Sequence, residues 1–175
     1  MKKLLPLFLL IVSVAAYSQK PAKLPKEISE KYDKFNDRTE ISLELVAVPP
    51  KSGWLSGGGF PNTNIHFEYA GKTLAADVTE FTIVFLDGCS RYSSCFRDSD
   101  EVIFLLDDSE RLKKGNAIMS GVVDDVIGFN LTRDDLVKLG SAKKVEFKVG
   151  NYEALLRPKE LPLFKALLEM ATAKK

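Results

Sequence analysis

The only two cysteines of the chain, Cys89 and Cys95, lie close together in the stretch CSRYSSC. A disulfide can close a ring of this size, and the chain-entropy model gives roughly 2.4 kcal/mol for a loop of about seven residues. A two-cysteine redox motif has a shorter spacing, with two residues between its cysteines. A zinc site would need two further ligands. We therefore predict a Cys89–Cys95 disulfide, with free thiols and a metal site as alternatives, and we predict no resident metal or cofactor.

His66 is the only histidine, and a histidine is the natural general base near neutral pH. A hydrolase would also need a nucleophile, such as a serine, and an orienting carboxylate nearby in space. No serine lies in a recognisable nucleophile turn. The alternation of polar and apolar residues around His66 puts it on the polar side of a strand, which favours a solvent-facing side chain. A secreted hydrolase that uses His66 is therefore an alternative hypothesis, and no residue is assigned as catalytic.

Two aromatic residues, Trp54 and Phe60, flank three consecutive glycines at 57–59. Such side chains can close over a ligand, or they can pack into the core as anchors of the loop. A ring closed by a disulfide would present Arg91 and Tyr92, and a rigid loop binds at a lower entropic cost. An inhibitor that inserts this ring into a partner is thus a second alternative. The candidate ligand-binding residues are Trp54, Phe60, His66, Arg91 and Tyr92.

Two other patterns resemble parts of ligand-binding motifs but do not match the complete motifs. Gly71-Lys72-Thr73 matches the end of a phosphate-binding loop, but His66 stands where that motif requires a glycine. The pattern favours a hairpin turn instead. Paired aspartates do not match the twelve-residue calcium loop, which has a central glycine and a final glutamate. These pairs are Asp98/Asp100, Asp107/Asp108, Asp124/Asp125 and Asp134/Asp135.

The first 18 residues have the three-part pattern of a secretory signal peptide. Lys2 and Lys3 precede an apolar run over 4–14, and small residues follow at Ala16 and Ser18. A run of about eleven residues is too short to span a bilayer, which takes roughly twenty. The lysine-led start is typical of bacterial signal peptides. We therefore predict cleavage after Ser18 and a secreted or periplasmic protein, in surroundings where neighbouring cysteines oxidise.

The charge balance excludes one class of partner. Loss of Lys2 and Lys3 would reduce the 25 basic residues to 23, against 24 acidic ones, for a net charge of −1. A near-neutral mixed surface gives no electrostatic reason to expect binding of nucleic acid. The mature chain has no other long apolar stretch, so we predict no transmembrane segment. The expected partner is a protein, a surface polymer or a small ligand of unknown identity.

Local patterns then indicate the elements that must position these residues. The segment KKVEFKVGNYEALLRP predicts a β-hairpin, because Gly150-Asn151 suits a two-residue turn. This register sets Lys148 opposite Glu153 and Phe147 opposite Ala154. Strands are predicted over 40–47, 64–69, 72–74, 81–87 and 101–108, in a return strand through 112, and over 126–131, 145–149 and 152–156. Helices are predicted over 27–35, 132–140 and 160–173, the second beginning at a capping box of Thr132 and Asp135 and ending at Gly140.

These elements predict an α+β fold. We expect a mainly antiparallel sheet of about seven or eight strands, curled or two-layered, with a covering helix at the C-terminus. The predicted organisation is a signal peptide at 1–18, a leader with a short helix at 19–38 and one globular domain at 39–175. Because no reaction motif stands out, the predicted function is non-enzymatic binding or a structural role.

Overall fold

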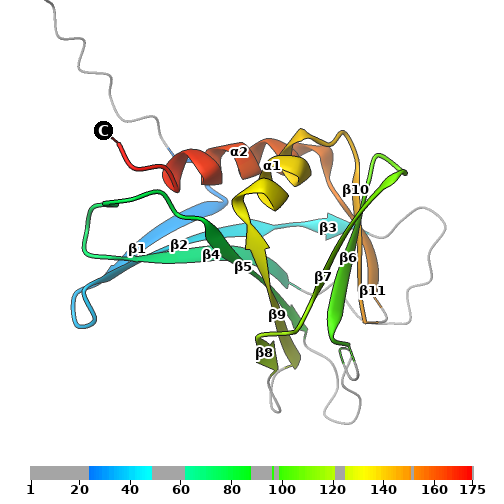
Figure 1. Ribbon diagram of the computed structural model, residues 1–175, viewed down its shortest axis with the longest axis horizontal. Coiled ribbons are helices and arrows are strands. Elements are labelled where there is room, and N and C mark those ends of the chain that lie inside the picture. The colour runs from blue at the N-terminus through cyan, green and yellow to red at the C-terminus, as the bar shows by residue number, and fades with distance from the viewer. Residues whose placement is uncertain are drawn as a thin grey trace, which may run out of the picture.

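The computed structural model describes residues 24–48, 62–87, 96, 99–120, 125–150 and 152–174. The predicted signal peptide therefore lies outside the described residues. Within these ranges the chain forms two antiparallel sheets and two α-helices, which lie together on one side of the sheets (Figure 1).

The larger sheet has six strands in the order β1-β2-β4-β5-β9-β8. Their bounds are β1 Ile28–Asp33, β2 Arg38–Leu45, β4 Asn62–Ala70, β5 Glu80–Asp87, β9 Asp125–Thr132 and β8 Met119–Ser120. The smaller sheet has five strands in the order β3-β11-β10-β6-β7. Their bounds are β3 Ala47–Val48, β11 Tyr152–Leu156, β10 Val145–Val149, β6 Glu101–Leu106 and β7 Glu110–Gly115. The helices are α1 Arg133–Ser141 and α2 Leu161–Met170, and a 3-10 turn, Pro158–Glu160, precedes α2.

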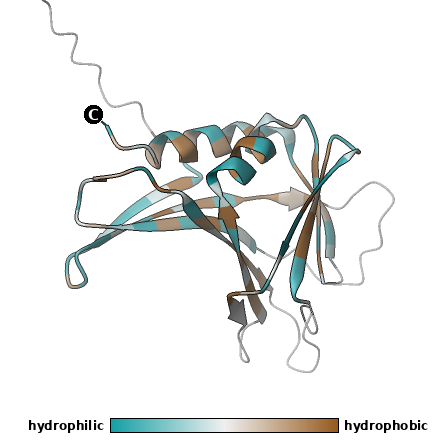
Figure 2. Ribbon diagram, viewed as in Figure 1, coloured by the Kyte–Doolittle hydropathy of each residue, from teal (hydrophilic) through white to brown (hydrophobic). Residues whose placement is uncertain are grey.

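The hydrophobic core lies between the two sheets and beneath the helices. Phe85 of the larger sheet contacts Phe147 of the smaller one, with ring centroids 5.3 Å apart. Phe129 and Phe104 extend this aromatic cluster on the two sides. Along the strands, hydrophobic and hydrophilic residues alternate (Figure 2), so each sheet turns one face to the core and the other outward.

The predicted fold class is confirmed: the protein is α+β, mainly antiparallel, two-layered and closed by a C-terminal helix. The strand predicted over 40–47 overlaps β2, in which Ile41, Leu43 and Leu45 are buried and Glu40 and Glu44 are exposed. The described residues form more strands than the seven or eight expected. The additional strands are β1, which the sequence pattern assigned to a helix, and the two-residue strands β3 and β8. A strand of two residues is too short to show a period.

The helix predicted over 27–35 is wrong, because this segment contains strand β1. Ile28 is buried, as a helical stripe would also require, but Phe35 is 87% exposed. The chain turns after β1, where the backbone N–H of Phe35 donates to the Asp33 carboxylate at 2.8 Å and Asp37 adopts a positive φ of 49°. β1 then pairs along its whole length with β2. Pairing with a neighbouring strand outweighs a weak local preference for helix.

The strand predicted over 72–74 is also wrong. Residues 71–79, here called the linker, connect β4 to β5 without a strand. Gly71 begins the linker with a φ of +75° and donates its N–H to the carbonyl of Asp37 at 2.7 Å. Its own carbonyl accepts from the Thr39 hydroxyl at 2.6 Å. These bonds direct the chain along the β1–β2 turn, so it does not fold back on β4.

The hairpin and the capping box are confirmed. β10 and β11 pair in the predicted register, with Phe147 opposite Ala154, and Lys148 Nζ lies 2.8 Å from a carboxylate oxygen of Glu153. Thr132 caps α1, since its hydroxyl accepts from the backbone N–H of Asp135 while the Asp135 carboxylate accepts from the backbone N–H of Thr132. Both features depend on contacts between residues near in sequence, which is why the sequence shows them.

Gly140 does not end α1 as predicted, because the helix continues to Ser141. The role of Gly140 is to permit close packing of the two helices. A Cβ placed at Gly140 would lie 3.0 Å from the Cβ of Phe164 in α2 and 3.7 Å from the carbonyl oxygen of Leu161. The glycine is therefore required by the approach of α2 and not by a change in backbone direction.

Helix α2 closes the core with a buried stripe of Leu161, Phe164 and Leu167. Pro162 occupies its first turn, where the missing N–H costs no helical hydrogen bond. Among the described residues, no helix is both long enough and apolar enough to cross a membrane.

Candidate ligand-binding cleft

Several predicted site residues lie outside the described residues. They are Trp54, Phe60, Cys89, Arg91, Tyr92 and Cys95. The disulfide, the aromatic lid and the inhibitory ring therefore stay predictions. His66 is the one candidate binding residue that the structure describes.

His66 lies in β4 on the outer face of the larger sheet and is half-buried. The register sets it between Ser42 of β2 and Thr82 of β5, and Thr82 in turn pairs with Asn130 of β9. A polar row thus crosses four strands, in agreement with the predicted polar face. No described residue forms a hydrogen bond or an ion pair with the His66 side chain. The described residues therefore do not show an assembled triad of serine, histidine and carboxylate.

The acidic pairs have structural roles where they are described. Asp107 and Asp108 form the β6–β7 turn, and the Asp107 carboxylate accepts backbone N–H groups from Lys143 and Lys144. Asp135 belongs to the cap of α1. Within the described ranges, no three residues of histidine, cysteine, aspartate or glutamate are grouped so that they could hold a metal ion.

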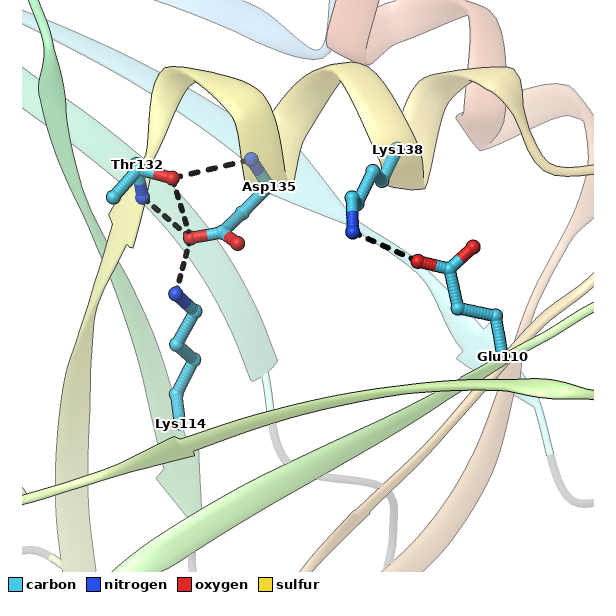
Figure 3. Close-up of polar contacts among 5 residues, drawn as sticks. All are labelled: Glu110, Lys114, Thr132, Asp135 and Lys138. Carbon is cyan, nitrogen blue, oxygen red and sulfur yellow. Dashed lines mark hydrogen bonds and ion pairs between the residues drawn. The ribbon is translucent and has the colours of Figure 1, made fainter.

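Figure 3 shows how α1 is joined to β7. The Asp135 carboxylate, 6% exposed, contacts Lys114 Nζ at 2.5 Å and the Thr132 hydroxyl at 2.8 Å, and Lys138 pairs with Glu110 at 2.8 Å. Burial acts to raise the pKa of Asp135, but the hydrogen bonds from Lys114 and Thr132 outweigh burial and lower it. These paired charges fasten the helix to the smaller sheet, so we assign this cluster a structural role.

A half-open cleft of about 550 Å³ lies elsewhere, between α2 and the inner face of the larger sheet. Ile41 of β2 and Tyr69 of β4 lie beneath it. One wall comes from Ala166 and Met170 of α2, and the linker contributes Leu74. The lining is mainly apolar, and the volume is within the range of small-molecule sites. We refer to this space as the cleft.

The cleft exists because the inner face of the larger sheet loses its cover toward β1. In the register of β1 with β2, Ile28 pairs with Leu43, Glu30 with Ile41, and Tyr32 with Thr39. Ile28 is buried, whereas Glu30 and Tyr32 on the same face are exposed. The change from isoleucine to glutamate and tyrosine marks the point at which the sheet meets solvent. The partly covered part of this face forms the base of the cleft.

Charged side chains belong to the rim. Lys72 Nζ lies 4.9 Å from the centroid of the Tyr32 ring, a cation–π contact. The Tyr32 hydroxyl donates to Asp37 at 2.8 Å, and this hydrogen bond raises its pKa. The remaining charged residues that line the cleft are Glu30, Glu169 and Lys174. The cleft therefore suits a ligand whose apolar part enters and whose polar part stays at the mouth.

The cleft could not be identified from the sequence. Ile41 and Tyr69 belong to the strands predicted over 40–47 and 64–69, and the C-terminal helix is predicted as a cover, but the space between them is not predicted. The available signal was Glu30 and Tyr32, whose period of two continues the inner face beyond the apolar core. That signal was lost because the segment was interpreted as a helix.

Comparisons of the chain with protein family models, with curated proteins and with solved structures find no match.

Proposed function

We propose that the protein is an exported, non-enzymatic binding protein that holds a small, mainly apolar ligand in the cleft. The observation that supports this most directly is the cleft itself, a space of about 550 Å³ with an apolar lining and charges at its rim. A binding site of this kind obtains its affinity from apolar surface removed from water, while a few polar groups orient the ligand. Export is part of the proposal and depends on the predicted signal peptide.

Two fluorescent probes test this proposal. Anilinonaphthalene sulfonate carries an anionic group on an apolar body, and N-phenylnaphthylamine has a similar apolar body without charge. We expect saturable binding with a one-to-one stoichiometry. If Lys72 at the rim attracts the polar part of the ligand, the sulfonate should bind more tightly. The protein should begin at Gln19 and carry no tag, because Leu24 and Lys174 both line the cleft and a tag would lie beside it.

A matched pair of variants locates the binding. Ala166 is half-buried and lines the cleft, whereas the neighbouring Lys165 is exposed and does not line it. Ala166→Trp should fill the cleft and weaken binding by roughly tenfold or more, which corresponds to about 1.4 kcal/mol. Lys165→Trp should bind like the wild type. Equal affinities in the two variants, or no saturable binding to the wild type, would contradict the proposal.

The alternative hydrolase has one observation in its favour. Ser42 lies directly opposite His66 on the same face of the sheet, so a nucleophile and a base are close in space. The test is hydrolysis of a panel of nitrophenyl esters by the wild type and by His66→Ala. Activity lost in a folded His66→Ala would favour the hydrolase over the binding protein. The inhibitor alternative is tested with trypsin-like proteases at micromolar protein, and a lack of inhibition would end it.

A further inference from the structure

The two walls of the cleft come from segments far apart in the sequence. The linker contributes Lys72, Thr73 and Leu74, and the C-terminal part of the chain contributes the 166–174 side. The distance between these segments sets the width of the cleft. The groups that join them therefore decide whether the cleft keeps a fixed shape.

Arg133, the first residue of α1, lies where these segments meet. One guanidinium nitrogen donates to the carbonyl of Val78 in the linker at 3.3 Å and to the carbonyl of Ala171 at 3.4 Å. The other donates to the carbonyl of Leu168 at 3.4 Å and to the Thr172 hydroxyl at 2.5 Å. A single side chain thus bonds the linker and the end of α2, and one of its acceptors, Thr172, lines the cleft.

Backbone contacts reinforce the same junction. Val78 N–H donates to the carbonyl of Ala171 at 2.9 Å, and Arg133 N–H donates to the carbonyl of Thr79 at 3.0 Å. The backbone N–H of Ala173 donates to the Asp77 carboxylate at 2.9 Å. The linker, the end of α2 and the start of α1 therefore meet at one place, and Arg133 is the side chain common to all three.

The chemistry of this junction requires arginine. A guanidinium has five donors in a rigid fork, whereas a lysine ammonium is a single compact centre. No carboxylate among the described residues forms an ion pair with Arg133, whose acceptors are three carbonyls and one hydroxyl. Its positive charge also lies at the C-terminal end of α2, the negative end of the helix dipole.

We infer that Arg133 is the positioning residue of the cleft: it fixes the linker against the end of α2 and so holds the cleft at its binding width. This inference rests on the proposed function for its ligand, which is a small, mainly apolar molecule. Arg133 does not line the cleft, so it acts on the ligand only through the two walls.

The test compares Arg133→Met with Arg133→Lys and with Leu106→Ala. Methionine keeps an unbranched, flexible side chain and removes every donor. Leu106 is buried in the smaller sheet at the β6–β7 end and serves as a destabilised control, because loss of a core leucine lowers the melting temperature without touching the junction. Binding of N-phenylnaphthylamine and amide hydrogen exchange at Val78 and Ala173 are measured for all four proteins.

We expect Arg133→Met to bind the probe roughly tenfold more weakly and to exchange both amides faster, with Arg133→Lys in between. Leu106→Ala should bind within about twofold of the wild type at a temperature where it is folded. Equal exchange at Val78 and Ala173 in wild type and Arg133→Met overturns the inference. So does an affinity loss in Arg133→Met no larger than that in Leu106→Ala. If the wild type binds neither probe, the proposed function fails, and the exchange data still show whether Arg133 joins the walls.

Discussion

The two ends of the six-stranded sheet have the same strand pattern but different surroundings. At the β5–β9 end, Phe85 and Phe129 are fully buried, and Phe85 contacts both Phe129 and Phe147 of the smaller sheet. At the β1–β4 end, the same inner face carries exposed Glu30 and half-buried Tyr69, and the space above them is the cleft. Alternation along a strand therefore defines which face points inward, and the neighbouring layer decides whether that face is sealed or available to a ligand.

The first prediction tests the difference in packing directly. Phe147→Ala should lower the free energy of unfolding by about 3–5 kcal/mol, because it removes a ring in contact with Phe85 and Phe104. Met170→Ala at the cleft should cost about 1 kcal/mol or less, since its side chain is only partly buried. Denaturant unfolding of both variants measures the contrast. Similar losses would show that the cleft is packed as tightly as the sealed end.

The second prediction concerns the support of α1 next to the sealed end. Asp135→Ala should cost about 2 kcal/mol, because it removes the Asp135 half of the capping box and leaves Lys114 without its carboxylate. Asp134→Ala is the matched control, since this exposed aspartate is in the same helical turn. It should change the unfolding free energy by less than about 0.5 kcal/mol. An equally large loss of unfolding free energy in Asp134→Ala would show that the effect comes from the interaction of a negative charge with the helix dipole.

The Asp135 carboxylate should also make the unfolding free energy depend on pH. The pKa of Asp135 is lowered from its usual value of 3.8, so the ionised form stabilises the folded protein. This contribution is complete above the unfolded pKa and is lost as the pH falls through the lower folded pKa. The difference in unfolding free energy between wild type and Asp135→Asn should therefore shrink as the pH falls below 3.8. A difference that stays constant across this range would contradict the assignment.

The next prediction tests the contact between the two helices, one of which forms a wall of the cleft. Alanine normally stabilises a helix relative to glycine, by roughly 0.5–1 kcal/mol. At Gly140 the new methyl group would meet Phe164 at 3.0 Å, so Gly140→Ala should instead destabilise the protein by about 1 kcal/mol. Thermal unfolding gives the sign, and a stabilised variant would mean that α2 can move away at little cost.

The smallest effect is expected on the outer face of the sheet. His66→Ala should change the unfolding free energy by less than about 0.5 kcal/mol, because no described residue bonds to its side chain. It should also leave probe binding in the cleft unchanged, since His66 lies on the opposite face. Weaker probe binding in this variant would show that a residue on the outer face affects the cleft on the inner face.

The sequence predicted the parts of the fold that depend on neighbouring residues. The Gly150 hairpin and the Thr132 cap are formed by residues close in the chain, so their patterns are visible directly. β1 was misassigned because its structure depends on β2, and Gly140 was misassigned because its neighbour, Phe164, is in the other helix.

The cleft was beyond sequence reasoning for the same reason. Its residues come from the start of the described chain, the linker and the last helix, and no short pattern connects them. Arg133 was not singled out either, because its acceptors are mostly backbone carbonyls, which leave no trace in side-chain types. His66 could be placed on its polar face because strand alternation alone decides that.

The bond between Ala173 and Asp77 joins residues 96 positions apart, close to the last described part of the chain. During synthesis the hairpins of both sheets can form as each emerges, but this junction has to wait until α2 is complete. A ribosome-bound chain that lacks α2 would therefore have its strands but not the cleft. If the cleft holds a ligand as proposed, binding would begin only after α2 has been made, so the ligand could not guide earlier steps of folding.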